Sequence, residues 1–400
     1  MLKTKLVFGT YNSLPVGSAD YQFEEAYQKA YKPFLTELYN YPDISLILYY
    51  SGTLLEWFEA KHPEFLMLIN DMVKRRQVEL LGGGYHEPFF PLIPNTDRLG
   101  QIEALTTFIR EKFGKRPRGV WIAESVWEPS LTSMLKNSGM DFILLGEDNF
   151  FDAGMTSADI FSPIITEDQG KILTVYPVHN HIIRKFHKSS FSEVVSGLTA
   201  QSQRKEPEKT AVIFIRGETL GYCNKSFEEY YQEKGLSRFL DLIKANKDKI
   251  ETAKPGELTK NQDALTKSYL MSSSYSTLFG WMDNQGGAPA KKKSDKTAVA
   301  HKKAGNFRQL LTKYEESNLL YSKMMYTQVL VKQIRGDKAR KKSAREELWK
   351  GQCNRAYWHG PNGGIYDKDL RKAAYRSLLR AEKITQEKGI FIPSIVTSES

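Results

Sequence analysis

The sequence predicts an α/β fold, a distorted β/α barrel of about seven strands followed by a C-terminal helical subdomain. Two observations lead to this prediction. In the first part of the chain, short apolar runs alternate with segments of helical periodicity, which is typical of βα units on a mostly parallel sheet. From about Ala288 a lysine-rich stretch precedes long helical patterns. We therefore expect a barrel domain over residues 1–285 and a helical subdomain over residues 286–400.

The expected strands are apolar runs, which lie in chain order at Leu6–Gly9, Ser45–Tyr50, Val78–Leu81, Gly119–Ala123, Phe142–Leu145, Ile172–Tyr176 and Ala211–Ile215. Between the strands, apolar side chains recur at helical spacing and predict helices over Phe23–Tyr39, Leu54–Glu59, Glu64–Arg76 and Arg98–Phe113. The subdomain is expected to hold helices over Asn306–Gln333, Lys338–Gln352 and Asp369–Lys388. An eight-stranded barrel and an open sheet are alternatives that the same alternation allows.

The chain is basic, with a formal net charge of +10 and a pI near 9.2. The excess lies mainly in Lys291–Lys293, His301–Lys303 and Arg335–Lys350, and acidic residues interrupt these runs. No helix-turn-helix, zinc or RNA-recognition signature accompanies them. We interpret them as a solvated loop and a polar helix face, and expect no nucleic-acid partner.

The two cysteines, Cys223 and Cys353, are far apart and match no metal-ligand spacing. The chain passes from Met1 almost directly into an apolar strand, and no apolar run reaches membrane-spanning length. We therefore expect a cytoplasmic protein without cofactor, metal or membrane contact; the oligomeric state stays open. His179-Asn180-His181 is expected to be a surface pair of histidines on a strand rather than a zinc site.

Polar and aromatic residues follow several of the expected strands, where β/α barrels build their active sites. Glu124 is the candidate nucleophile, because a retaining glycosidase needs one carboxylate nucleophile and a second carboxylic acid about 5–5.5 Å away. Trp121 is the candidate for stacking on a sugar. From spacing alone, a structural carboxylate at the barrel rim explains Glu124 equally well.

Three motifs extend this interpretation. Residues 121–129 read W-I-A-E-S-V-W-E-P, residues 84–88 read G-Y-H-E-P, and residues 352–360 read Q-C-N-R-A-Y-W-H-G. They resemble W-L-T-E-R-V-W-Q-P, G-F-Y-E-P and Q-C-N-D-A-Y-W-H-G of glycoside hydrolase family 57, which includes 4-α-glucanotransferases and α-amylases. The resemblance runs through nearly the whole chain in the same order, without the β-rich C-terminal domain of the longer glucanotransferases.

The resemblance implies an α-1,4-glucan or maltooligosaccharide as ligand and a retaining reaction with Glu124 as nucleophile. It also implies substrate contacts at the strand ends and in the C-terminal motif, namely at Asn12, His86, Glu87, Trp121, Tyr357, Trp358 and His359, and a further one at Trp281.

At four positions the chain lacks a histidine or carboxylate of the family motifs. The family's H-N-H-Q-P is Tyr11-Asn12-Ser13-Leu14-Pro15 here, Arg216 replaces the acid/base Asp of D-G-E, and Arg355 replaces another Asp. A guanidinium keeps its protons at any physiological pH, so it cannot serve as donor and base in turn. We therefore expect a glucan-directed protein with weakened or absent catalysis. One alternative is an active glucanotransferase or amylase in which Glu218 or another rim carboxylate donates the proton. Another is a non-catalytic scaffold that binds a partner through its basic helices.

Overall fold

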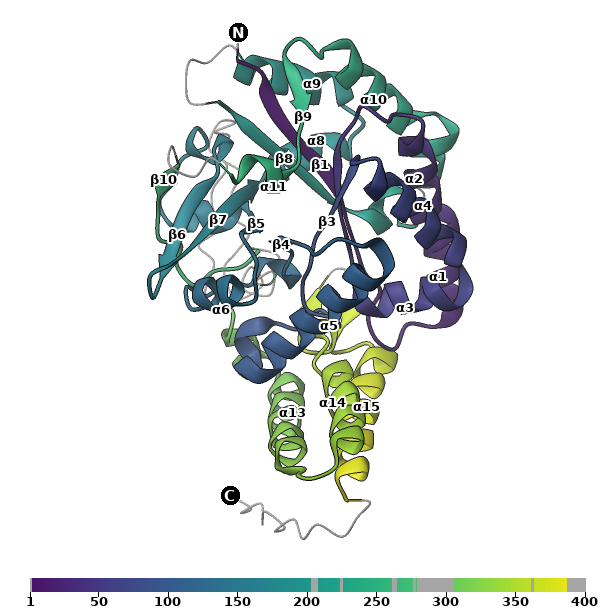
Figure 1. Cartoon of the computed structure of the whole chain (residues 1–400), viewed down its shortest axis with the longest axis vertical. Helices are drawn as coiled ribbons and strands as arrows, with labels where there is room; N and C mark the ends of the chain where they lie inside the picture. The colour runs from purple at the N-terminus through teal and green to yellow at the C-terminus, as the bar shows by residue number, and fades with distance from the viewer. Residues whose placement is uncertain are drawn as a thin grey trace, which may run out of the picture.

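The computed structural model describes residues 2–202, 208–223, 226–260, 265–275, 278, 306–360 and 363–386. A mainly parallel sheet forms its centre, and helices pack around the outside of the sheet (Figure 1). Parallel pairing joins β8 to β1, β2 and β3 on one side and to β7, β5 and β4 on the other. The bounds of these strands are β1 Thr4–Asn12, β2 Leu46–Tyr50, β3 Val78–Leu80, β4 Gly119–Val120, β5 Phe142–Gly146, β7 Lys171–Val178 and β8 Thr210–Arg216.

The two ends of this series meet at Gly82, just beyond β3. Its N–H donates to the carbonyl of Gly119 at 2.8 Å, and its carbonyl accepts from the N–H of Trp121 at 2.9 Å. The β7–β8 contact is short, since only Val178 pairs with Val212. The predicted distorted β/α barrel is therefore confirmed, and the distortion lies between β7 and β8.

Three further strands of the main sheet were not predicted. β6 (Ile164–Asp168) runs antiparallel to β7, β9 (Ile250–Thr252) pairs with the start of β1, and β10 (Thr266–Lys267) pairs with β6. The β6–β7 hairpin turns at Gln169 and Gly170, which both have positive φ. A Gln at such a position is a weaker hairpin signal than Asn or Asp, so the sequence pattern did not reveal the turn.

The predicted helices are confirmed with two corrections. The segment predicted as one helix over Phe23–Tyr39 contains a π-helical turn, Tyr27–Tyr31, and the segment Asn306–Gln333 breaks at Tyr314. The helices of the barrel are α1 Asp20–Ala26, α2 Lys32–Tyr39, α3 Gly52–Lys61, α4 Pro63–Lys74, α5 Asn95–Phe113, α6 Leu131–Asn137, α7 Glu147–Asp152, α8 Asn180–Phe186, α9 Phe191–Ser202, α10 Gly235–Ala245 and α11 Pro255–Leu258. Those of the C-terminal part are α12 Gln309–Lys313, α13 Glu315–Gln333, α14 Lys338–Gly351 and α15 Lys368–Gln386, beside the short hairpin β11 (His359–Gly360) and β12 (Gly363–Gly364).

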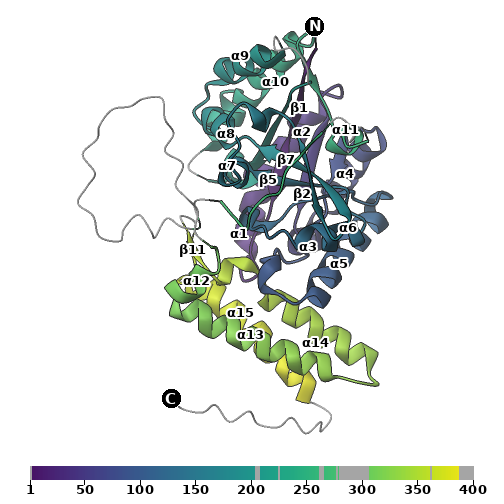
Figure 2. The ribbon, with the colours of Figure 1, turned by 90° about the vertical axis from the view of Figure 1, so that its left-hand side faces the viewer.

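Helices α13, α14 and α15 project from the end of the barrel near α5 (Figures 1 and 2). Gln352 joins the two parts, because its amide donates to Asp97 at 2.8 Å and accepts from Gln101 at 2.9 Å, and both partners lie on α5. The basic run Arg335–Lys350 forms most of α14, with Lys338, Lys342 and Arg345 exposed. The runs Lys291–Lys293 and His301–Lys303 lie outside the described residues.

Within the described part of the chain, no helix has the length and apolar character needed to cross a membrane.

The approach of β1 to β2 depends on Gly9. A Cβ at this position would lie 1.8 Å from the carbonyl oxygen of Ile47 in β2. Because both strands are buried, neither backbone can move without disturbing the barrel core.

We expect Gly9→Ala to lower the free energy of unfolding by about 1–3 kcal/mol, the usual cost of overpacking. Chemical denaturation monitored by circular dichroism measures it. The control is Gly197→Ala in α9, where nothing lies within 4 Å of the added Cβ; it should stabilise by about 0.5–1 kcal/mol through helix propensity. Equal effects of the two substitutions would contradict this account.

Candidate active site

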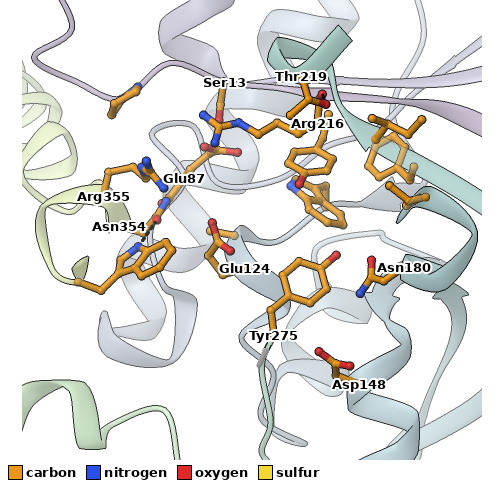
Figure 3. Close-up of a pocket in the computed structure, with 18 of the residues that line it drawn as sticks. Ser13, Glu87, Glu124, Asp148, Asn180, Arg216, Thr219, Tyr275, Asn354 and Arg355 are labelled. Carbon is orange, nitrogen blue, oxygen red and sulfur yellow. Dashed lines mark hydrogen bonds between the residues drawn. The ribbon is translucent and has the colours of Figure 1, made fainter. Parts of the chain in front are cut away.

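A pocket of about 430 Å³ opens at the carboxyl ends of the barrel strands. Side chains reach it from the ends of β1, β3, β4, β5, β7 and β8 and from the loop after α14 (Figure 3). Its charged or polar lining residues are Ser13, Glu87, Glu124, Asp148, Asn180, Arg184, His187, Arg216, Thr219, Asn354 and Arg355, and its aromatic ones are Tyr11, Trp121, Phe214, Tyr275 and Trp358. This is the end of the barrel at which the sequence predicted the site.

Glu124 reaches the pocket from a strained backbone. Its φ is 52° and that of Ser125 is 49°, in the left-handed region that costs non-glycine residues about 1–3 kcal/mol each. Two hydrogen bonds hold this conformation: Tyr275 N–H donates to the Glu124 carbonyl at 3.0 Å, and Gly146 N–H donates to Ser125 Oγ at 3.1 Å. Burial raises the pKa of Glu124, while the charges of Arg355 and Arg216 act to lower it.

Arg216 is held in the pocket by a buried carboxylate. Its Nε lies 2.9 Å from Oε2 of Glu218, whose other oxygen accepts from Tyr31 Oη at 2.5 Å and from Ser13 N–H at 2.8 Å. Burial alone would lower the pKa of Arg216, but the charge of Glu218 raises it above the ordinary arginine value. Arg216 is therefore a permanent cation beside Glu124.

Glu218 does not line the pocket. Its side chain is fully buried, and both carboxylate oxygens are already bonded to protein groups. A proton donor must reach the glycosidic oxygen of a bound sugar. The geometry is therefore unfavourable to Glu218 as a replacement acid.

Glu87 enters the same pocket from the loop between β3 and α5. Its φ is 51°, again left-handed. Asn354 holds its backbone from the C-terminal part of the chain, because the Asn354 N–H and Nδ2 both donate to the Glu87 carbonyl, at 3.0 and 2.6 Å. The pKa of Glu87 is raised to about 7, mainly by burial and also by the charges of Glu218 and Glu124. A hydrogen bond from Ser13 and the charge of Arg216 act to lower it.

The aromatic rings of the pocket are packed against one another. Trp121 is only 2% exposed, since Tyr11 stacks on it with ring centroids 4.5 Å apart and Phe214 meets it edge-on at 5.2 Å. The sequence assigned Trp121 to sugar stacking; it lines the pocket, and Tyr11 covers one face of its ring. Trp358 also lines the pocket, 3% exposed, and its Nε1 donates to Asn354 at 3.2 Å.

Four of the expected substrate contacts do not line the pocket. Asn12 is buried and its amide donates to the carbonyl of Tyr49 at 2.9 Å, which joins β1 to β2. His86 is buried against Thr53, and burial lowers its pKa to about 3. Tyr357 is buried and donates to the carbonyl of Gly351, whereas His359 is exposed on β11. Trp281 lies outside the described residues.

Several pocket residues were not found from the sequence. Asp148 follows β5, and Asn180 and Arg184 follow β7 on α8, so a search of every strand end would have named them. Tyr275 comes from a segment without strand or helix pattern, and no sequence signal places it over Glu124.

The histidine pair differs from its prediction. His179 is fully buried before α8 and His181 contacts the buried Glu147, with Nδ1 2.6 Å from Oε2. The pair therefore lies at the start of a helix, partly in the interior, rather than on a surface strand. The described residues contain no group of three metal-ligating side chains placed to hold an ion.

Comparison with known proteins agrees with this geometry. The sequence profile of glycosyl hydrolase family 57 matches residues 8–271, which include the barrel and most of the pocket. The chain belongs to glycoside hydrolase family 57. A second profile, the middle domain of α-amylase/4-α-glucanotransferase, matches residues 305–385.

Two relatives and one solved structure illustrate the similarity. α-Amylase 1 of Dictyoglomus thermophilum is 32% identical over 394 residues, 96% of this chain and 57% of that protein. The 4-α-glucanotransferase of Thermococcus litoralis is 32% identical over 96% of this chain and 58% of its own length. The crystal structure of a 4-α-glucanotransferase from the same organism superposes with a TM-score of 0.84 at 30% identity, over 96% of this chain and 60% of that one. The chain thus spans about three fifths of the length of these relatives.

Tyr11, Ser13, Arg216 and Arg355, the four motif positions singled out from the sequence, all line this one pocket. Two of them place guanidinium groups in its lining.

We expect Glu218→Gln to lower the free energy of unfolding by about 2–3 kcal/mol. Breaking a fully buried ion pair costs about 3–5 kcal/mol. We expect a smaller loss here because the Arg216 side chain keeps 22% exposure. Denaturant titration measures the change. The control is Glu25→Gln, which breaks the exposed pair with Lys29 and should cost under about 1 kcal/mol. A change in Glu218→Gln no larger than in the control would show that the pair does not hold the site together.

Proposed function

We propose that this chain binds α-1,4-glucan or maltooligosaccharide in the rim pocket, and that Arg216 removes most of its capacity to cleave or transfer the bound chain. The observation that carries the proposal is the cation fixed by Glu218 at the position where the family motif has its acid/base carboxylate. Membership of family 57 supports the ligand class, as does the similarity to proteins named α-amylase and 4-α-glucanotransferase.

Glu124 is suited to the role of the carboxylate nucleophile. It keeps its place in the motif and lines the pocket. Burial raises its pKa, and the charges of Arg355 and Arg216 partly offset this rise and so favour the ionised form. A carboxylate held in this way can attack an anomeric carbon. The same two cations oppose the positive charge that develops on the sugar in the transition state, so they reduce the rate beyond the loss of the acid.

The loss of general acid/base catalysis typically lowers the reaction rate by a factor of about 10²–10⁴. The alternative in which Glu218 acts as the acid/base has little support, because both of its carboxylate oxygens already accept hydrogen bonds from Arg216, Tyr31 and Ser13.

Restoring the family residues tests the proposal. We expect a variant with Tyr11→His, Ser13→His, Arg216→Asp and Arg355→Asp to cleave or transfer maltoheptaose about 10²–10⁴ times faster than the natural chain. Arg216→Asp alone should gain less, because it leaves Glu218 beside a second carboxylate without a cation. Products are resolved by chain length with time, and thermal unfolding checks that each variant is folded.

The matched control adds Glu124→Gln to the restored variant and should abolish the gain. A natural chain as fast as the folded, restored variant would contradict the role of Arg216. A gain that survives Glu124→Gln would contradict the role of Glu124.

A further inference from the structure

We infer that Glu87 is the proton donor and acceptor for whatever glycoside cleavage this chain retains. The inference rests on the proposed function, since it needs a glucan in the pocket and Glu124 as nucleophile. It assigns to Glu87 the task for which Arg216 is unfit and Glu218 is unavailable.

Glu87 lies where a ligand bound against Glu124 would also contact it. Both side chains line the pocket, and they reach it from different strand ends, after β3 and after β4 (Figure 3). Asp148 is the remaining carboxylate of the lining, and it lies on the other side of Tyr275 from Glu87. Among the described carboxylates, Glu87 therefore pairs best with Glu124 across a sugar.

The backbone of Glu87 is fixed by a segment more than 260 residues away. Asn354 gives two hydrogen bonds to its carbonyl, and the next residue, Pro88, forms a β-bridge with Cys353. These contacts hold a left-handed conformation that is unfavourable for glutamate. Strain maintained in this way is common in side chains that must point at a reacting group.

The surroundings of Glu87 suit a group that both gives and takes a proton. The charged groups that face it are Glu124, Glu218, Arg216 and Arg355, and the titratable ones are Tyr11, Tyr49 and Cys353. Burial is the largest influence, and it raises the pKa of Glu87 to about 7. An acid/base group works best with a pKa near the working pH.

The reaction then balances in two steps. A carboxylate oxygen of Glu124 bonds to the anomeric carbon as the glycosidic C–O bond breaks, and the departing oxygen takes the proton of Glu87. In the second step the Glu87 carboxylate removes a proton from water or from a sugar hydroxyl. That oxygen bonds to the anomeric carbon, and the bonding electrons return to Glu124.

The test compares two substrates that differ in their need for an acid. Maltoheptaose requires a protonated leaving group, whereas α-maltosyl fluoride releases fluoride without one. We expect Glu87→Gln to slow maltoheptaose conversion by about 10²–10⁴ and to change the first turnover of the fluoride by less than about threefold. Glu124→Gln should abolish both. Glu87→Asp, which shortens the side chain but keeps the acid, should retain part of the maltoheptaose rate.

The pH profile separates proton transfer from a merely structural role. Below its pKa Glu87 is protonated and can donate, so the maltoheptaose rate of the natural chain should fall as the pH rises through about 7. This fall should be absent from the first turnover of the fluoride.

The outcomes are distinguishable. If fluoride is released in a Glu124-dependent way but maltoheptaose is untouched, or is converted equally by folded Glu87→Gln, then the role of Glu87 is overturned and the proposed function stands. If the natural chain releases no fluoride, then the roles of Glu124 and Glu87 in this chain both fail, and the restored variant described above decides whether the proposed function stands.

Discussion

A guanidinium group can remain in the interior of a barrel only beside a compensating negative charge, and this constraint organises the pocket. Glu218 supplies the charge to Arg216 and is itself held by Tyr31 and by the backbone of Ser13. Removing one partner of such a pair leaves a charge without compensation, at a cost of several kcal/mol. The pair therefore ties together the ends of β1 and β8 and the helical segment that carries Tyr31. The same pair makes Glu218 unavailable for chemistry and places a fixed cation beside Glu124.

Two of the three carboxylates that line the pocket, Glu124 and Glu87, depend on distant parts of the chain. Both adopt left-handed backbone conformations. A hydrogen bond from the N–H of Tyr275 holds the backbone of Glu124, and two hydrogen bonds from Asn354 hold that of Glu87. The loop after α14 thus contributes to the site as directly as the barrel does. This dependence gives a physical reason why the barrel and the C-terminal helices occur together, since neither part alone would hold both carboxylates in place.

Much of this arrangement could be predicted from the sequence. Apolar runs located the strands, and motif spacing located Glu124, Glu87 and Arg216 at one end of the barrel. The remainder depends on contacts that have no sequence period. The covering of Trp121 by Tyr11 follows from their stacking across the barrel, and the contact of Tyr275 with Glu124 joins residues about 150 positions apart. Asn12 belongs to the first motif, yet its amide joins two strands, because residues alternate between the faces of a strand.

A crystal structure of the full chain soaked with maltoheptaose would show whether sugar enters the pocket while Arg216 stays bound to Glu218. We expect a sugar ring in the rim pocket with its anomeric carbon facing the Glu124 carboxylate, while Arg216 keeps its bond to Glu218. Sugar bound only elsewhere on the molecule would contradict it. So would an Arg216 that leaves Glu218 and vacates the pocket when the sugar enters, because the cation would then be no obstacle to the reaction.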